Sequence, residues 1–248
     1  MTLDIIEAPF LPPIYHCGPP LSSGALPSVF YFSLSGNESL SLDPYNQPAV
    51  YLAKHGIRVF SLTLPGHEGA HPHLGALESW AHSIISGKNV IQDFAEVCCR
   101  SIDFLLSSGY LLENKIAVAG LSRGAFTAAQ LAALDNRVNL LLGFSPLTTL
   151  DHFIQMDHVA CPELSSQYIV DNLADKTVRY YIGNRDVRVG TNHCFTFIQS
   201  LVEASYAKKH RSPPIEMIVF PSIGHKGHGT PPNIFLEGAE WLKQTLTS

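Results

Sequence analysis

Short apolar runs alternate along the chain with amphipathic stretches. Runs of about four to eight apolar, β-branched or aromatic residues bounded by Gly, Pro or Asn predict strands buried on both faces. Apolar residues spaced three and four positions apart predict helices. The expected strands cover residues 28–34, 57–64, 115–121, 139–144, 177–183 and 215–220. The expected helices cover residues 43–55, 77–108 (in two pieces that part near Gly87), 123–130, 193–208 and 233–246.

This order predicts an α/β protein. A strand, a helix and a second strand joined by connections of this length pair in parallel with a right-handed crossover. We therefore expect one mainly parallel, twisted sheet of about eight strands, with helices on both faces. Residues 3–17 contain three prolines and predict an antiparallel hairpin at the sheet edge. Residues 147–176 are irregular and predict a short cap-like insertion after the sixth strand, within a single domain of residues 1–248.

Composition narrows the class of protein. The chain has 248 residues, 46% of them hydrophobic and 15% charged, with a net charge of −5. Because there is no basic excess, nucleic acid is not an expected partner. No signal peptide or apolar run long enough to span a membrane is evident. The 5 cysteines are an odd, scattered set typical of reduced thiols. We expect a cytoplasmic protein without a cofactor.

Residues 120–124 form a Gly-x-Ser-x-Gly motif between a buried strand and an Ala-rich helix. In this context the Ser lies on a strained strand-to-helix turn, and a side chain at either Gly would collide with neighbouring backbone. The turn exposes the hydroxyl of Ser122 above the sheet, where the first amides of the helix point. Ser122 is therefore the expected nucleophile.

Two more strand ends carry residues that could activate this Ser. Ligands of doubly wound sheets bind outside the carboxyl ends of strands, and Asp186 and His225 follow two such ends. His225 is the expected general base and Asp186 the carboxylate that orients it. Asp151 is the alternative acid and His228 the alternative base. We favour His225 because it follows its strand sooner, where the loop still overhangs Ser122.

Other candidates have simpler explanations. The loop histidines His67, His71 and His73 suggest a metal site, but they lack a carboxylate at fixed spacing, so no metal is expected. Trp80 and Phe153 could line a pocket, although core packing is the simpler expectation for either aromatic ring.

Several segments resemble the α/β-hydrolase superfamily, and the resemblance covers residues 28–246. Residues 116–124, the Phe-Ser-Pro at 144–146, and residues 183–189 look most like the catalytic domains of dienelactone hydrolase and prolyl oligopeptidase. Residues 65–69, Pro-Gly-His-Glu-Gly, are similar to a turn common across the superfamily. One departure is Ser35-Gly36, where many members have His-Gly.

The resemblance implies a triad in the chain order Ser, acid, His, which Ser122, Asp186 and His225 follow. It also implies an oxyanion hole. The amide of Arg123 is one expected donor, and a second comes from Ser35, Gly36 or Asn37.

The expected function is a serine hydrolase that cleaves a carboxylic ester, or a thioester, of a small acyl substrate through an acyl-enzyme. A serine peptidase or aminoacyl-amide hydrolase of the same fold is one alternative. A non-catalytic binding protein that keeps the fold is another, since fold alone does not fix function. A small-molecule ester or acyl compound is the expected partner, and the sequence does not set the oligomeric state.

Overall fold

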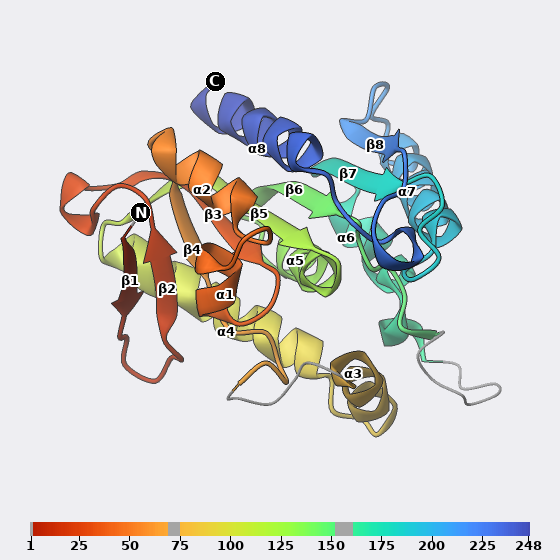
Figure 1. Ribbon diagram of the computed structural model, residues 1–248, viewed down its shortest axis with the longest axis horizontal. Coiled ribbons are helices and arrows are strands. Elements are labelled where there is room, and N and C mark those ends of the chain that lie inside the picture. Colours follow the sequence, from red (N-terminus) through yellow and green to blue (C-terminus); the bar gives the residue numbers. More distant parts are fainter. Residues whose placement is uncertain (1, 69–74, 152–160) are drawn as a thin grey trace.

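The fold is built around one eight-stranded sheet (Figure 1). A computed structural model describes residues 2–68, 75–151 and 161–248. The strand order is β1-β2-β4-β3-β5-β6-β7-β8. Strand β2 pairs antiparallel with both β1 and β4, and the remaining neighbours are parallel. The predicted α/β class, the mainly parallel sheet and the antiparallel edge hairpin are confirmed.

The strands are β1 Leu3–Ile6, β2 Ile14–Cys17, β3 Leu26–Phe32, β4 Arg58–Ser61, β5 Leu111–Leu121, β6 Val138–Phe144, β7 Thr177–Gly183 and β8 Ile215–Phe220. The helices are α1 Gly36–Ser41, α2 Gln47–Lys54, α3 Ala76–Ile85, α4 Val90–Ser107, α5 Arg123–Leu134, α6 Val170–Leu173, α7 Thr191–Ala207 and α8 Pro232–Thr247. The described part of the expected insertion, residues 147–151 and 161–176, contains α6 and short 3₁₀ turns.

Helix α1 was not among the expected helices. No helix was predicted between the expected strand at residues 28–34 and residue 43, but α1 begins at Gly36. The side chain of Ser35 accepts a hydrogen bond from the amide of Glu38, and the Glu38 carboxylate accepts one from the amide of Ser35. This reciprocal capping box satisfies two amides and starts a helix in a sequence rich in loop-forming residues.

Helices cover both faces of the sheet because successive residues of its buried strands point to opposite sides. Phe30 and Phe32 of β3 pack on the side of α3, α4, α5 and α7. Val29 and Tyr31 pack on the side of α1, α2 and α8. Figure 1 shows α8 and α4 on opposite sides of the strands. Each continuous apolar run in the sequence therefore contributes alternate residues to two separate cores.

The central strands end together at one edge of the sheet. Leu121 pairs with Phe144, Phe144 with Tyr181, and Gly183 with Phe220. The loops after β5, β6, β7 and β8 therefore start at nearly the same height. This register places the candidate residues near one another. Within the three described ranges, no helix has both the length and the apolar character needed to cross a bilayer.

Candidate active site

Ser122 occupies the turn between β5 and α5. Its backbone has φ 55° and ψ −117°, a sparsely populated conformation for a residue with a side chain. The Ser122 amide donates to the Phe144 carbonyl at 2.8 Å, and the Ser122 carbonyl accepts from the amides of Ala125 at 3.0 Å and Leu147 at 3.1 Å. These bonds hold the strained turn that the motif predicted.

The two flanking glycines are required by close backbone contacts. A Cβ at Gly120 would lie 2.2 Å from the carbonyl carbon and oxygen of Gly124. A Cβ at Gly124 would lie 2.0 Å from the carbonyl oxygen of Phe32. The turn can therefore form only if both positions lack a side chain.

A histidine and a carboxylate lie in line with the Ser122 hydroxyl. Nε2 of His228 is 2.9 Å from Oγ of Ser122, and Nδ1 of His228 is 2.7 Å from Oδ2 of Asp186. A carboxylate oxygen accepts, so Nδ1 carries the hydrogen and Nε2 accepts from the hydroxyl. The arrangement can take a proton from Ser122 as its oxygen attacks an electrophile.

Asp186 is fixed by its own loop. Its side chain is buried, and Oδ1 accepts the backbone amides of Arg188 at 3.0 Å and Val189 at 3.1 Å. The Asp186 amide donates to Oγ1 of Thr191 at 3.0 Å. One carboxylate oxygen is thus anchored while the other orients the imidazole. The alternative acid, Asp151, is exposed and accepts from the hydroxyl of Thr149 at 2.7 Å instead.

The preference for His225 is corrected by this geometry. Both hydrogen bonds, to Ser122 and to Asp186, come from His228. The loop after β8 does not run straight outward: it makes a 3₁₀ turn over His225–Gly227, and Gly229 returns to pair with Ile223 in an antiparallel bridge. His228 is next to that bridge, so it lies over Ser122 although it comes later in the chain.

The Ser35–Asn37 segment, which was expected to supply the second oxyanion amide, is not among the residues that line the cavity beside Ser122. The amide of Ser35 donates to Glu38 at 3.2 Å, and the amide of Gly36 donates to Oγ1 of Thr63 at 3.1 Å. Asn37 lies in α1, where its backbone and side-chain oxygens accept from Ser41. Leu34 and Ser33, one and two residues earlier, line the cavity beside Ser122 and Arg123.

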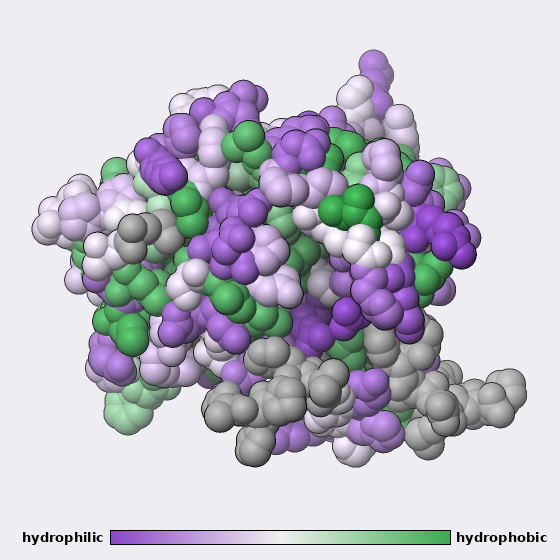
Figure 2. Space-filling view, in the orientation of Figure 1, coloured by the Kyte–Doolittle hydropathy of each residue, from purple (hydrophilic) through white to green (hydrophobic). Residues whose placement is uncertain are grey.

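The cavity above Ser122 has a volume of about 410 Å³. Leu34, Leu121 and Phe235 form part of its apolar wall, while Arg123 and Arg188 contribute charged groups. His225 also lines it. Figure 2 shows a mixed polar and apolar face that is hollowed near its centre. Neither Arg188 nor the cationic character of this cavity was predicted from the sequence.

Arg123 is held by His67 of the predicted Pro-Gly-His turn. Its Nη1 lies 3.1 Å from Nε2 of His67, whose Nδ1 lies 3.0 Å from the Pro65 carbonyl. Since a guanidinium only donates, Nε2 accepts and the imidazole is neutral. Trp80, which is buried in the core, also donates to the Pro65 carbonyl, at 2.9 Å. Burial, and then the charge of Arg188, lower the pKa of Arg123 to about 10.

The metal interpretation concerned His67, His71 and His73. His67 serves as the acceptor for Arg123, while His71, His73 and also Phe153 lie outside the described residues. In residues 2–68, 75–151 and 161–248, no three His, Cys, Asp or Glu side chains cluster closely enough to hold a metal ion.

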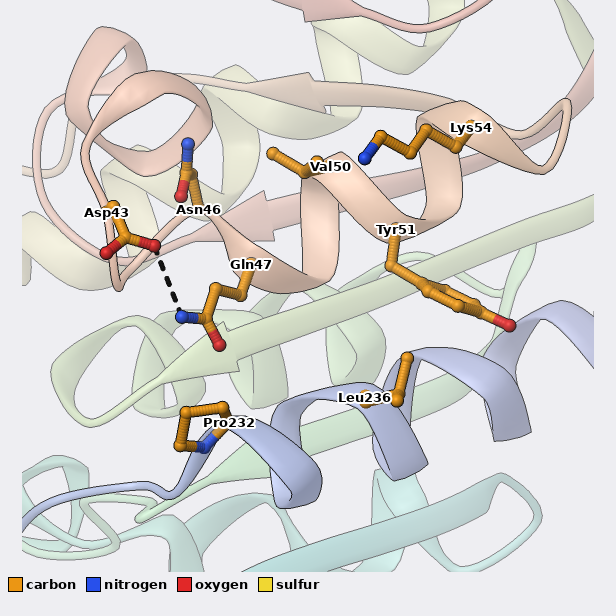
Figure 3. A pocket seen from close by; sticks show the side chains of 8 residues that line it. All are labelled: Asp43, Asn46, Gln47, Val50, Tyr51, Lys54, Pro232 and Leu236. Carbon is orange, nitrogen blue, oxygen red and sulfur yellow. Dashed lines mark hydrogen bonds between the residues drawn. The ribbon is translucent and has the colours of Figure 1, made fainter.

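A second cavity, of about 330 Å³, lies between α2 and α8 (Figure 3). Asp43, Gln47, Tyr51 and Leu236 are among its lining residues, and the side-chain Nε2 of Gln47 donates to Oδ1 of Asp43 at 3.2 Å. The eight residues that line it include no Ser, Cys or His. The Ser122 cavity is therefore the candidate for catalysis.

Comparisons with known proteins show what the fold of this chain is similar to. No protein-family model and no curated protein sequence matches the chain. Among solved structures, TT1662 from Thermus thermophilus matches all of both chains with a TM-score of 0.72 and 17% identity. The acetyl xylan esterase from Paenibacillus sp. R4 matches 98% of this chain and 88% of its own, with a TM-score of 0.65 and 17% identity.

A puromycin-hydrolysing peptidase of Mycobacterium tuberculosis matches 99% of this chain and 40% of its own, with a TM-score of 0.68 and 17% identity. Structures named for dienelactone hydrolase and dipeptidyl aminopeptidase IV also match, in agreement with the resemblance stated from the sequence. At these identities the likeness concerns the fold, which this chain shares with esterases and other hydrolases. The chain therefore has the α/β-hydrolase fold.

Proposed function

We propose that this protein is a serine hydrolase that cleaves a carboxylic ester of a small acyl substrate. The observation that carries the proposal is the hydrogen-bonded line from Ser122 through His228 to Asp186, at 2.9 Å and 2.7 Å. The three residues come from three separate loops, so their alignment is not a by-product of one local motif. The cavity above Ser122 is of the size that small ligands occupy.

The reaction follows from the roles of these atoms. Oγ of Ser122 attacks the ester carbonyl carbon while Nε2 of His228 takes its proton. The tetrahedral intermediate collapses, the bond to the leaving alcohol breaks, and His228 returns the proton to the alcohol. A water molecule then attacks the acyl-enzyme, again giving a proton to His228, and the acid leaves as Ser122 is restored. Asp186 stabilises the imidazolium in both halves.

Two backbone amides are the proposed donors to the oxyanion. The amide of Arg123 is the first of α5, where the helix dipole also favours negative charge. For the second we replace the 35–37 segment by Leu34, since Leu34 lines the cavity. Its amide donates to Oγ of Ser39 at 3.1 Å and would have to share its hydrogen with the substrate. Losing one such donor costs about 3–4 kcal/mol of transition-state stabilisation.

Esters are preferred over amides in this proposal because an alcohol leaves more readily than an amine. Thioesters fit the same chemistry. Esterases and a peptidase both occur among the structural neighbours, so the assay includes 4-nitrophenyl esters, a thioester and aminoacyl 4-nitroanilides.

The test is covalent labelling with a fluorophosphonate, combined with hydrolysis of 4-nitrophenyl acetate. The wild-type protein is expected to be labelled and to turn over, and Ser122→Ala to do neither. His228→Ala is expected to lose at least about 10³-fold in kcat, a magnitude typical of triad variants. His210→Ala, an exposed histidine paired with Asp175, is the matched control.

Absence of labelling in a folded wild-type protein would favour the non-catalytic alternative. A larger loss of kcat in His225→Ala than in His228→Ala would restore the original choice of base.

A further inference from the structure

The same two segments of the chain line both the cavity above Ser122 and the cavity between α2 and α8. Pro44, Tyr45 and Phe235 line the Ser122 cavity. Their neighbours in the sequence line the α2–α8 cavity: Asp43, Asn46, Gln47, Pro232 and Leu236. Consecutive Cα atoms are about 3.8 Å apart, so adjacent residues that border different cavities separate the two. Pro44, Tyr45 and Phe235 therefore form a wall between the cavities.

Figure 3 shows on which side of the α2–α8 cavity this wall stands. Asp43, Asn46 and Pro232 lie at one end of the cavity, and Lys54 lies at the other. The chain passes through the wall between Asp43 and Asn46, so the wall stands at the first of these ends. The cavity, of about 330 Å³, thus begins behind the wall and continues between the two helices.

The wall has a buried part and an exposed part. The ring of Phe235 is only 2% exposed and meets the ring of Phe144 edge-on, with 5.0 Å between their centroids. Tyr45 is 37% exposed, and its carbonyl accepts the hydroxyl of the fully buried Tyr31 at 2.6 Å. Close-packed side chains resist displacement, so the buried part does not yield to a chain that presses against it. Tyr45 completes the wall at the surface.

The space behind the wall suits an alkyl chain. Leu236, which is 50% exposed, gives it apolar surface. The side-chain amide of Gln47 already donates to Asp43 at 3.2 Å, and the hydroxyl of Tyr51 donates to Glu240. Because these polar groups have partners within the protein, an alkyl chain can lie beside them without leaving them unpaired.

We propose that Tyr45 and Phe235 set the longest chain that an ester substrate can carry. A short chain fits within the Ser122 cavity, and a longer one meets the wall before it can reach the α2–α8 cavity. This inference rests on the proposed hydrolase function and names the residues that confine it to short-chain esters.

The experiment measures kcat/KM for two series of esters, each below the concentration at which its longest member forms micelles. One series is 4-nitrophenyl acetate, butyrate, hexanoate and octanoate, and the other is ethyl, butyl, hexyl and octyl acetate. In the wild type, the eight-carbon member of at least one series is expected to react at least about tenfold more slowly than its four-carbon member, since a pocket of fixed size excludes extra methylenes.

Tyr45→Ala opens the wall from its exposed side. In the affected series it is expected to raise the ratio of the eight-carbon to the four-carbon kcat/KM at least about tenfold, because each methylene that gains apolar surface contributes about fourfold. Phe235→Leu shortens the buried part of the wall and keeps an apolar side chain, so the ratio is expected to change in the same direction. The unfolding midpoint and fluorophosphonate labelling verify that each variant is folded and active.

Leu236→Trp tests whether the longer chain enters the α2–α8 cavity. Combined with Tyr45→Ala, the larger side chain fills that space and is expected to return the ratio most of the way to the wild-type value. Alone it is expected to leave the ratio unchanged, because the chain does not reach Leu236 in the wild type. Leu112→Trp is the matched control, at an exposed Leu near the start of β5 and so at the end of that strand remote from Ser122. It is expected to change neither ratio.

The outcomes separate this inference from the proposed function. If the wild type is labelled and hydrolyses the eight-carbon and four-carbon members equally well in both series, the wall is wrong and the hydrolase stands. A wild-type ratio in both Tyr45→Ala and Phe235→Leu would also overturn the wall. A ratio raised by Tyr45→Ala that Leu236→Trp does not lower would overturn the assignment of the second cavity. If no ester is hydrolysed and Ser122 is not labelled, the proposed function itself fails.

Discussion

A hydroxyl pair connects the end of β6 to the loop that carries His228. Ser145 follows β6 directly, is fully buried, and has φ 41°. Its Oγ lies 2.9 Å from Oγ1 of Thr230, two residues after His228. The Ser145 amide donates to the Tyr181 carbonyl at 2.7 Å, which fixes Ser145 itself. We predict that this pair stabilises the fold and holds His228 over Ser122.

Three variants perturb this pair: Ser145→Ala, Thr230→Val and the double variant that carries both substitutions. A hydrogen bond of this kind contributes about 0.5–1.5 kcal/mol, and a buried hydroxyl left alone costs about 1–3 kcal/mol. Each single variant is therefore expected to lose about 1–2 kcal/mol. The double variant is expected to lose about 1 kcal/mol less than the sum, because no unpaired hydroxyl remains.

Urea unfolding of the four proteins measures these free energies, and hydrolysis of 4-nitrophenyl acetate measures the consequence for the site. We expect kcat/KM to fall about fivefold in Ser145→Ala, since a small displacement of the base slows proton transfer. Losses of free energy that add within about 0.3 kcal/mol would show that the two hydroxyls are not coupled. Unchanged kcat/KM in every variant would refute the positioning role.

Three other predictions concern different parts of the chain. Gly124→Ala is expected to lose about 3 kcal/mol or more of unfolding free energy, because its Cβ would lie 2.0 Å from the Phe32 carbonyl oxygen. Gly109→Ala, just after α4 at φ 71° with no atom within 4 Å of its Cβ, is the control and should lose about 1 kcal/mol. His16 is buried, and burial followed by the charge of Arg58 lowers its pKa. The unfolded state therefore takes up a proton that the folded state resists, so the free energy of unfolding should fall as the pH drops below the ordinary pKa of about 6.5, and it should fall less in His16→Leu. Urea unfolding at pH 8 and pH 5 measures this loss, and an equal loss in the wild type and in His16→Leu would contradict the prediction. Burial raises the pKa of Cys17, Cys99 and Cys194 to about 12 and also raises the pKa of Cys98 and Cys161, so iodoacetamide at pH 7.5 should leave ester hydrolysis intact. Rapid inactivation would show a reactive thiol near the site.

Ser122 and Asp186, the proposed nucleophile and acid, could be placed from the sequence because local rules determine their positions. The glycines around Ser122 are demanded by backbone contacts within a few residues and with β3. Asp186 directly follows the turn that ends β7, an edge set by the apolar run. Neither position depends on how a longer loop folds. The same holds for the sheet, whose strands follow from continuous apolar segments.

The positions of the proposed base, His228, and of the proposed second oxyanion donor, Leu34, depend on non-local contacts. His228 lies over Ser122 because Ile223 and Gly229 form a bridge and Gly227 approaches the Arg185 backbone, where a Cβ would lie 2.2 Å from its carbonyl oxygen. Counting residues from β8 cannot reveal such a fold-back. Arg188 was missed for a similar reason, since its place in the cavity depends on the positions of both α5 and the loop after β7.

The whole site depends on the register of the parallel strands. Ser122 follows β5, Ser145 follows β6, Asp186 follows β7, and His228 follows β8, so each strand end sets the height of one side chain. One residue of slip along a strand moves its end by about 3.3 Å, more than the tolerance of a hydrogen bond. A shifted β7 or β8 would therefore break the contacts at 2.7 Å or 2.9 Å even if all three residues were present. The alternating cores prevent such a slip, because a shift by one residue exchanges the faces of Tyr180 and Tyr181, which pack in different cores. The apolar pattern that stabilises the sheet thus also positions the proposed catalytic atoms.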